Sequence, residues 1–184
     1  MTHYYNAQIF LAQSYMAFLT DETRLLTNPG LKDGVREAVS AAAVIADGFK
    51  TGVVDGGHFV IRRFVATSSG VYVSHPGSAM PDGFDPLREQ WYRKALRMRG
   101  RTILTARLDP GGAGHVVTLS YTVGGGVVVG MDLTLGHMYN AVRAASPVNF
   151  CDERGIKCFL FDEEGFLLVH PIMFDATYIG PIER

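Results

Sequence analysis

The chain has 184 residues, with 17 basic and 18 acidic residues and a formal net charge of −1 at pH 7. This length is that of one domain, or of one domain with part of another, and 47% hydrophobic residues can form a core. The balanced charge argues against a nucleic-acid-binding protein and against an acidic, disordered chain. The chain contains no run of 18 apolar residues, so no transmembrane helix is predicted, and residues 1–5 lack the features of a signal peptide.

The N-terminal part has the apolar pattern of two helices. In residues 4 to about 27 the apolar side chains recur at spacings of three and four, which places them on one helix face. An Asn-Pro-Gly sequence at 28–30 ends this segment. A second helix is predicted over about 31–49, where an alanine-rich stretch precedes a series of glycines.

From residue 59 onward the pattern changes to short segments rich in β-branched and aromatic residues, which are typical of strands. Glycine, proline, serine and aspartate between these segments predict tight turns, and short connections favour antiparallel pairing. The chain is therefore predicted to be α+β. The predicted strands cover 59–67, 71–74, 102–108, 115–123 and 127–131, with helices at 87–99 and 135–144 and a last hairpin at 157–162 and 166–170.

These elements predict three parts: N-terminal helices (1–57), a five-stranded module (58–147) and the first hairpin of an incomplete second module (148–184). Residues 69–76 and 164–171 share a turn glycine, a strand and a His-Pro pair. Two related modules in tandem would explain this likeness, and so would chance.

Sequence motifs of enzymes are absent. The chain has no G-x-x-x-x-G-K-[ST] phosphate loop, no G-x-S-x-G elbow, no H-E-x-x-H helix and no G-x-G-x-x-G turn. The glycine runs at 111–114 and 124–126 lie between predicted strands and are expected to be hairpin loops. We therefore expect no enzymatic activity, no cofactor and no metal site.

Two local features allow alternatives. Trp91 and Tyr92 combine apolar rings with polar tips, which suits either a core position or a pocket wall. Cys151 and Cys158 are too few for a metal site. They are either two unrelated buried thiols or a small-loop disulfide formed in an oxidising compartment.

The order of motifs resembles that of double Cache domains. The resemblance rests on residues 67–72, 75–77, 84–92, 105–109 and 129–135. Such domains occur in bacterial chemoreceptors and histidine kinases, in the alpha-2-delta subunits of voltage-gated calcium channels and in VWFA-and-Cache proteins. The cysteine pair followed by residues 159–166 is more similar to the animal branch. The resemblance implies a PAS-like membrane-distal sheet, a smaller membrane-proximal module, an extracellular location and a disulfide between Cys151 and Cys158.

The resemblance also implies a ligand site. Family members that bind amino acids hold the ligand carboxylate with an arginine and the ammonium group with aspartates. In this chain Glu89 stands at the arginine position, and Arg88 lies one residue away, about 100° around the helix axis. Arg107 replaces a family tyrosine. The ligand-binding residues implied by the resemblance are Phe84, Glu89, Trp91, Tyr92, Arg107, Asp109 and Asp132.

These departures lead us to expect an extracellular structural or partner-binding module with a degenerate pocket. One alternative is a ligand sensor in which the two aspartates and the aromatic wall hold a small amine. In another, Arg107 binds the carboxylate of an amino acid. An intracellular PAS-type sensor of an aromatic cofactor, with reduced cysteines, is a further alternative. The predicted partners are a small amine or amino acid, or a membrane protein such as a channel, without nucleic acid and without membrane insertion.

Overall fold

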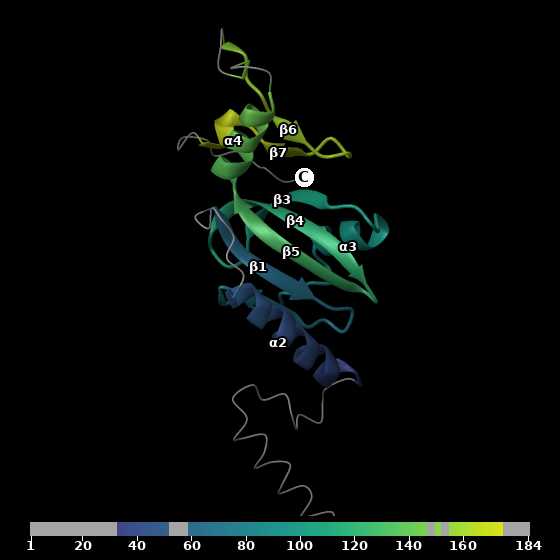
Figure 1. Cartoon of the computed structure of the whole chain (residues 1–184). Helices are drawn as coiled ribbons and strands as arrows, with labels where there is room; N and C mark the ends of the chain where they lie inside the picture. The colour runs from purple at the N-terminus through teal and green to yellow at the C-terminus, as the bar shows by residue number, and fades with distance from the viewer. Residues whose placement is uncertain (1–32, 52–58, 147–149, 152–154, 175–184) are drawn as a thin grey trace, which may run out of the picture.

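The computed structural model describes residues 33–51, 59–146, 150–151 and 155–174 (Figure 1). The first predicted helix, at residues 4–27, lies outside the described residues. The second is confirmed as α2, Val35–Thr51, which follows Gly34 and carries an acidic residue in its first turn and a basic one in its last. That arrangement of charges favours the helix dipole.

A five-stranded antiparallel sheet forms the centre of the molecule, with strand order β2-β1-β5-β4-β3. The predicted α+β class and the five strands are confirmed. Strand β5 continues beyond the predicted end at residue 131, because the following residues still pair with β4. Asp132 consequently lies inside the sheet. The strands are β1 Val60–Ala66, β2 Tyr72–His75, β3 Ile103–Asp109, β4 Gly114–Gly124 and β5 Val127–Thr134.

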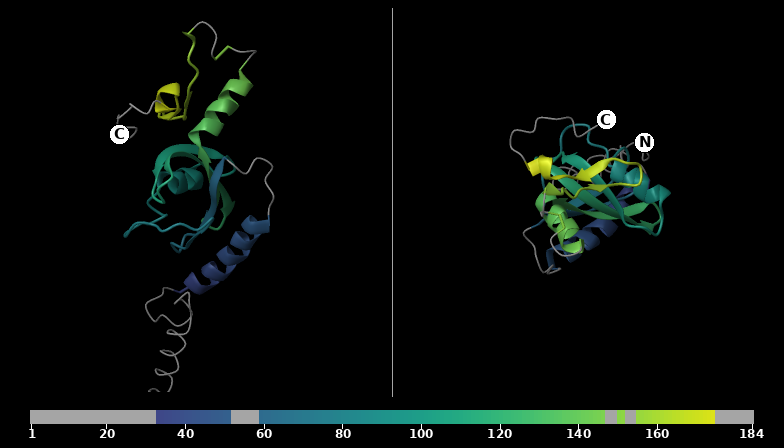
Figure 2. Two further views of the ribbon diagram at one scale, coloured as in Figure 1. Left: turned by 90° about the vertical axis from the view of Figure 1, so that its left-hand side faces the viewer. Right: turned by 90° about the horizontal axis from the view of Figure 1, so that it is seen from above.

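Different helices pack against different strands of the sheet. Helix α2 packs against β1 and β2, whereas α3, Gln90–Arg97, packs against β3, β4 and β5. Figure 2 shows α3 inside the curve of the sheet. Helix α3 begins later than predicted because a turn precedes it, in which the Asp85 carboxylate accepts a hydrogen bond from Leu87 N.

The apolar core lies between α3 and the sheet. Phe64 and Trp91 are fully buried there, with ring centroids 4.6 Å apart. Gly130, on the neighbouring strand, lies directly opposite Phe64. A Cβ at Gly130 would lie 2.5 Å from Phe64 Cζ, so the absence of a side chain allows the ring to pack against the sheet.

Helix α4, Leu135–Ala145, follows β5 directly and leads toward a second, smaller sheet (Figure 1). This hairpin comprises β6, Leu160–Phe161, and β7, Leu167–Val169, and is followed by the 3-10 helix η2, Pro171–Phe174. Both strands are shorter than predicted.

The hairpin is fixed to the main sheet by packing and by charge. Leu168 and Val169 are buried against Val117 of β4. Lys94, on the far side of α3, is 1% exposed and donates to Asp162 over 2.6 Å. A buried, paired lysine ties the hairpin to the helix that covers the sheet.

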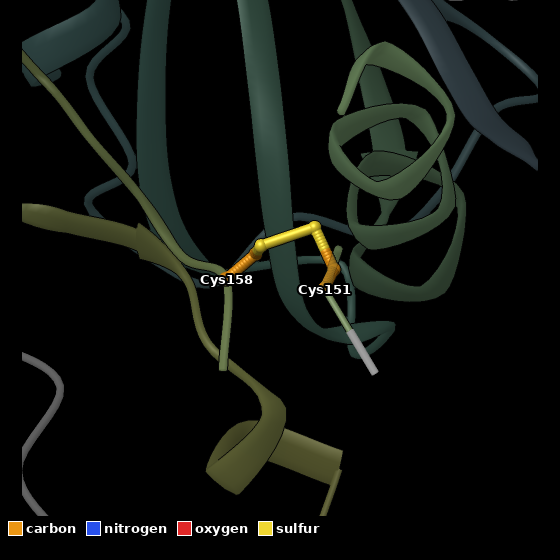
Figure 3. The surroundings of a disulfide bond; sticks show 2 residues. All are labelled: Cys151 and Cys158. Atoms are coloured by element: carbon orange, nitrogen blue, oxygen red, sulfur yellow. A yellow bond between two sulfur atoms is a disulfide. The ribbon is translucent and has the colours of Figure 1, made fainter. Parts of the chain in front are cut away.

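Cys151 and Cys158 form a disulfide, as the resemblance implied (Figure 3). Cys151 is buried. The bond closes a short loop between α4 and the hairpin. In the parts of the chain described, no helix combines the length and apolar character needed to cross a membrane.

Candidate functional site

The residues of the candidate site lie on the sheet face that carries α3. Along β3 burial alternates, so Thr105, Arg107 and Asp109 all lie on the buried face. Asp132 of β5 is paired with Thr118 of β4, which is itself paired with Thr105. The strand register therefore brings the two aspartates and Arg107 together from different strands.

Arg62 of β1 joins this group, although the sequence did not identify it. It is paired with Asp132 across the sheet, and its side chain is 4% exposed. Its Nη2 donates to Asp109 Oδ2, and its Nε lies 3.3 Å from Asp132 Oδ2. Its Nη1 donates to Ser78 Oγ over 2.7 Å. Arg62 thus bridges both carboxylates and reaches the loop before α3.

Arg107 forms the second ion pair of the site. Its Nη2 donates to both oxygens of Asp132, over 3.1 and 2.9 Å, and its Nε donates to Thr118 Oγ1 over 2.9 Å. The Thr118 hydroxyl donates in turn to Asp132 Oδ1 over 2.6 Å. Every oxygen of Asp132 is therefore already paired within the protein.

The cluster of Arg62, Arg107, Asp109 and Asp132 is neutral overall when each group is ionised. Burial raises the pKa of Asp132, while Arg107, Thr118 and Arg62 act in the opposite direction. Burial, reinforced by the Asp132 charge, raises the pKa of Tyr72 to about 12, although both arginines oppose it. Tyr72 is consequently a neutral hydroxyl at physiological pH.

Unpaired polar atoms concentrate at this site. Six buried side-chain atoms among the described residues have no hydrogen-bond partner, and most buried polar groups in proteins do have one. Five of them belong to residues of the cluster or of the aromatic wall beside it, and the sixth belongs to Thr105, which is paired with Thr118. The six atoms are Arg62 Nε, Tyr72 Oη, Trp91 Nε1, Thr105 Oγ1, Arg107 Nη1 and Asp109 Oδ1.

Aromatic rings form the wall next to the ion pairs. Tyr72 of β2 lies between Phe84 and Trp91, with ring centroids 5.2 and 6.4 Å away. Phe84 comes from the loop before α3 and Trp91 from its first turn. Phe84 and Trp91 thus both lie beside Tyr72, and Trp91 also belongs to the apolar core.

The remaining residues implied by the resemblance occupy different surroundings. Tyr92 lies in the apolar core, and its hydroxyl donates to Gly126 O over 2.7 Å. Glu89 is half-buried at the N-cap of α3. Arg88 has an 87% exposed side chain and pairs with Asp85 over 3.3 Å, so it does not replace the family arginine inside the site.

Sequence reasoning missed Arg62 and Tyr72. The available signal was strand periodicity: Arg62, Phe64 and Ala66 alternate along β1, so a charged residue shares the buried face with an aromatic one. A buried arginine requires a partner, and a carboxylate on the neighbouring strand provides it.

Comparison with known proteins identifies the class to which this fold belongs. The ligand-binding domain of the *Pseudomonas aeruginosa* chemoreceptor PctB, solved with L-Arg, has a TM-score of 0.56 and 26% identity over 74% of this chain and 58% of that one. The ligand-binding domain of *Pseudomonas fluorescens* CtaA, solved with L-valine, has a TM-score of 0.53 and 25% identity over the same shares. The fold is that of the Cache-type sensor domains of chemoreceptors.

The family is narrower than this class. Residues 2–143 match the model of the CACHD1 central domain, and the chain belongs to that family. A VWFA and cache domain-containing protein of *Drosophila melanogaster* is 32% identical over 96% of this chain. The chain spans 13% of the length of that relative.

Proposed function

We propose that this domain binds a small zwitterionic ligand of the amino acid class at the cluster of Arg62, Arg107, Asp109 and Asp132. The unpaired buried polar atoms of Tyr72, Trp91, Thr105, Arg107 and Asp109 carry the proposal, because leaving a buried donor or acceptor unsatisfied costs about 1–3 kcal/mol each. A ligand that supplies partners would recover much of that cost.

The unpaired atoms fall into hydrogen-bond donors and a hydrogen-bond acceptor. Arg107 Nη1 and Trp91 Nε1 are donors only, and the neutral Tyr72 hydroxyl can also donate. Together they suit a carboxylate. Asp109 Oδ1 is an acceptor only and suits an ammonium group. The site therefore offers complementary halves for a ligand that carries both charges.

Charge balance favours a zwitterion over a singly charged ligand. The two arginines and two aspartates sum to zero, so a bare amine or a bare carboxylate would add an uncompensated buried charge. A zwitterion adds none. The solved neighbours PctB and CtaA are described in complex with L-Arg and L-valine, which supports the same ligand class.

The ion pairs support the sequence-based alternatives for the ligand unequally. Asp132 is fully paired, so an amine held equally by both aspartates is disfavoured. Carboxylate binding by Arg107 gains support from its unpaired Nη1. An extracellular position as part of a longer membrane-associated protein is part of the proposal and rests on the resemblance to chemoreceptor domains.

The test uses three probes of similar size: L-alanine, ethylamine and propionate. Ligand at 100 times its dissociation constant stabilises the fold by about 2.7 kcal/mol, which corresponds to roughly 5–11 °C in Tm for a chain of this length. We expect L-alanine or a larger amino acid to raise Tm, and the two half-ligands to have no effect. Equal shifts with all three probes would contradict the charge argument.

Thr105→Val is the matched variant. The Thr105 hydroxyl makes no hydrogen bond, so its removal should leave Tm unchanged or raise it while weakening ligand binding. Thr118→Val is the contrasting variant, because that hydroxyl bonds both Arg107 and Asp132 and its loss should lower Tm.

A second function is favoured by the same ion pairs: a partner-binding module whose pocket is filled by its own side chains. Both aspartates contact arginines of this chain, as a degenerate pocket would require. A complete absence of shifts across an amino acid panel would favour this function. The search would then turn to protein partners, including the predicted membrane-protein partner.

A further inference from the structure

We propose that Arg62 is a tethered cation that occupies the cation-binding part of the site and thereby determines which ligands it accepts. The inference builds on the proposed ligand site but can be tested without its natural ligand. It goes beyond that site because it assigns the specificity to a residue of the first strand.

Counting acceptor positions leads to this assignment. A carboxylate offers about four lone-pair positions. Asp132 accepts three hydrogen bonds, two from Arg107 Nη2 and one from Thr118, and Arg62 Nε lies 3.3 Å from its Oδ2 as an ion-pair contact. Asp109 Oδ2 receives Arg62 Nη2 and Ala113 N, while Asp109 Oδ1 receives none. An incoming cationic group can therefore contact one oxygen, whereas without Arg62 it could lie between both carboxylates.

The turn between β3 and β4 is shaped around the Arg62 guanidinium. A Cβ at Gly111 would lie 2.5 Å from Arg62 Nη2 and 2.7 Å from Ser78 Oγ. With an alanine at this position, the guanidinium or the Ser78 side chain would have to move, whereas glycine lets the turn close over them undisturbed. Ser78 approaches from the loop before α3 and accepts from Nη1. The backbone of the β3–β4 turn and the Ser78 side chain of the loop before α3 thus enclose the guanidinium and hold it in one position.

Arg62 also sets the total charge. With it, the two carboxylates are balanced by two guanidinium groups. Without it, the site carries one excess negative charge and an empty position of guanidinium shape. The expected consequence is a change in selectivity, from zwitterions toward free cations.

The experiment measures stabilisation by methylguanidinium chloride at low millimolar concentrations, where general denaturation is negligible. Three proteins are compared: wild type, Arg62→Ala and Arg63→Ala. Arg63 is the next residue of the same strand and donates to Phe49 O on the opposite face, so it controls for loss of an arginine. We expect saturable stabilisation of Arg62→Ala, with apparent binding at least about tenfold tighter than to either other protein.

A second variant covers the case in which Arg62→Ala does not fold. Arg62→Ser also removes the guanidinium but keeps a hydroxyl that can donate to a carboxylate. It should gain the same methylguanidinium response, and refolding either variant with methylguanidinium present should recover more folded protein than refolding without it.

If neither Arg62→Ala nor Arg62→Ser responds more strongly than wild type, Arg62 does not occupy a cation site and the proposal is wrong. This outcome is distinct from failure of the proposed function, which is read from amino acid binding to the wild-type protein. If the wild-type protein binds no amino acid but Arg62→Ala binds methylguanidinium, the proposed function fails and the assignment of Arg62 stands.

Discussion

Tyr72 and Tyr92 provide a matched test of the unpaired polar atoms. Both tyrosines pack against Trp91, with ring centroids 6.4 and 5.9 Å away. They differ in the hydroxyl: that of Tyr92 donates to Gly126 O over 2.7 Å, whereas that of Tyr72 is buried near the Arg62 guanidinium and makes no hydrogen bond of normal geometry. Substitution by phenylalanine removes only the hydroxyl in each case and keeps the ring contacts.

The expected effects on stability have opposite signs. Tyr72→Phe removes a buried, unsatisfied group, so the ligand-free protein should be unchanged or stabilised by about 1 kcal/mol. Tyr92→Phe removes a hydrogen bond worth about 1 kcal/mol and leaves a carbonyl unpaired. For a chain of this length, 1 kcal/mol corresponds to about 2–4 °C in Tm. The two variants should therefore differ by at least a few degrees in differential scanning calorimetry.

Ligand binding separates the variants in the other direction. If the Tyr72 hydroxyl donates to a ligand carboxylate, its loss should cost about 1.5–3 kcal/mol, which is at least a tenfold weaker affinity. Tyr92→Phe should bind as wild type, because its hydroxyl bonds the β4–β5 turn instead. Isothermal titration with the amino acid identified by the screen measures both.

Two results would refute this reasoning. Equal destabilisation by Tyr72→Phe and Tyr92→Phe would mean that the Tyr72 hydroxyl has a partner in the ligand-free protein. Unchanged affinity in Tyr72→Phe, with a wild-type protein that binds, would remove Tyr72 from the ligand site.

Further predictions concern the hairpin and the sheet. Lys94→Met should leave Asp162 as a buried, uncompensated charge and destabilise the hairpin by about 3 kcal/mol, measured by hydrogen exchange. Arg97→Met is the control: the Arg97 side chain is 66% exposed, so loss of its pair with Glu164 should cost under about 1 kcal/mol. Burial alone would raise the pKa of Asp162, but hydrogen bonds from Lys94 and two backbone N–H groups lower it below its usual value. The stability that ionised Asp162 contributes is therefore present above the unfolded pKa of about 3.9 and is lost as pH falls through the lower folded pKa. Protection of the hairpin from hydrogen exchange should accordingly disappear in acid. Gly130→Ala should cost about 1–3 kcal/mol in urea denaturation, because the new methyl group collides with the Phe64 ring and with the backbone carbonyl of Leu119; unchanged stability would contradict this steric argument. The native protein should contain no titratable thiol before reduction, and free thiols would contradict the disulfide.

Local patterns in the sequence were sufficient for the elements. Enrichment in β-branched and aromatic residues between turn residues identified the five strands, since such side chains fit a half-buried pleated surface. Turn glycines then set the antiparallel order of β3, β4 and β5, because short connections leave no room for a crossover. The α+β class and the family resemblance followed from these features and from the spacing of the aromatic and aspartate motifs.

The charge pairing required the tertiary structure. Arg62 and Asp109 are 47 residues apart, and nothing local to either one indicates that they meet. The strand order places β1 beside β5, and the register then sets Arg62 opposite Asp132. A shift of one residue would turn the arginine to the opposite face.

The sequence by itself determined which chemical groups are available: aromatic rings before and within α3, an aspartate at the end of β3 and another within β5. Only the tertiary structure decided which of them are already paired. Hydrogen bonding depends on atoms within about 3 Å of each other, a separation fixed by strand register and loop closure rather than by spacing along the chain. For that reason Asp132 appears as a ligand residue in the sequence and as a fully paired residue in the fold, whereas the unpaired oxygen belongs to Asp109.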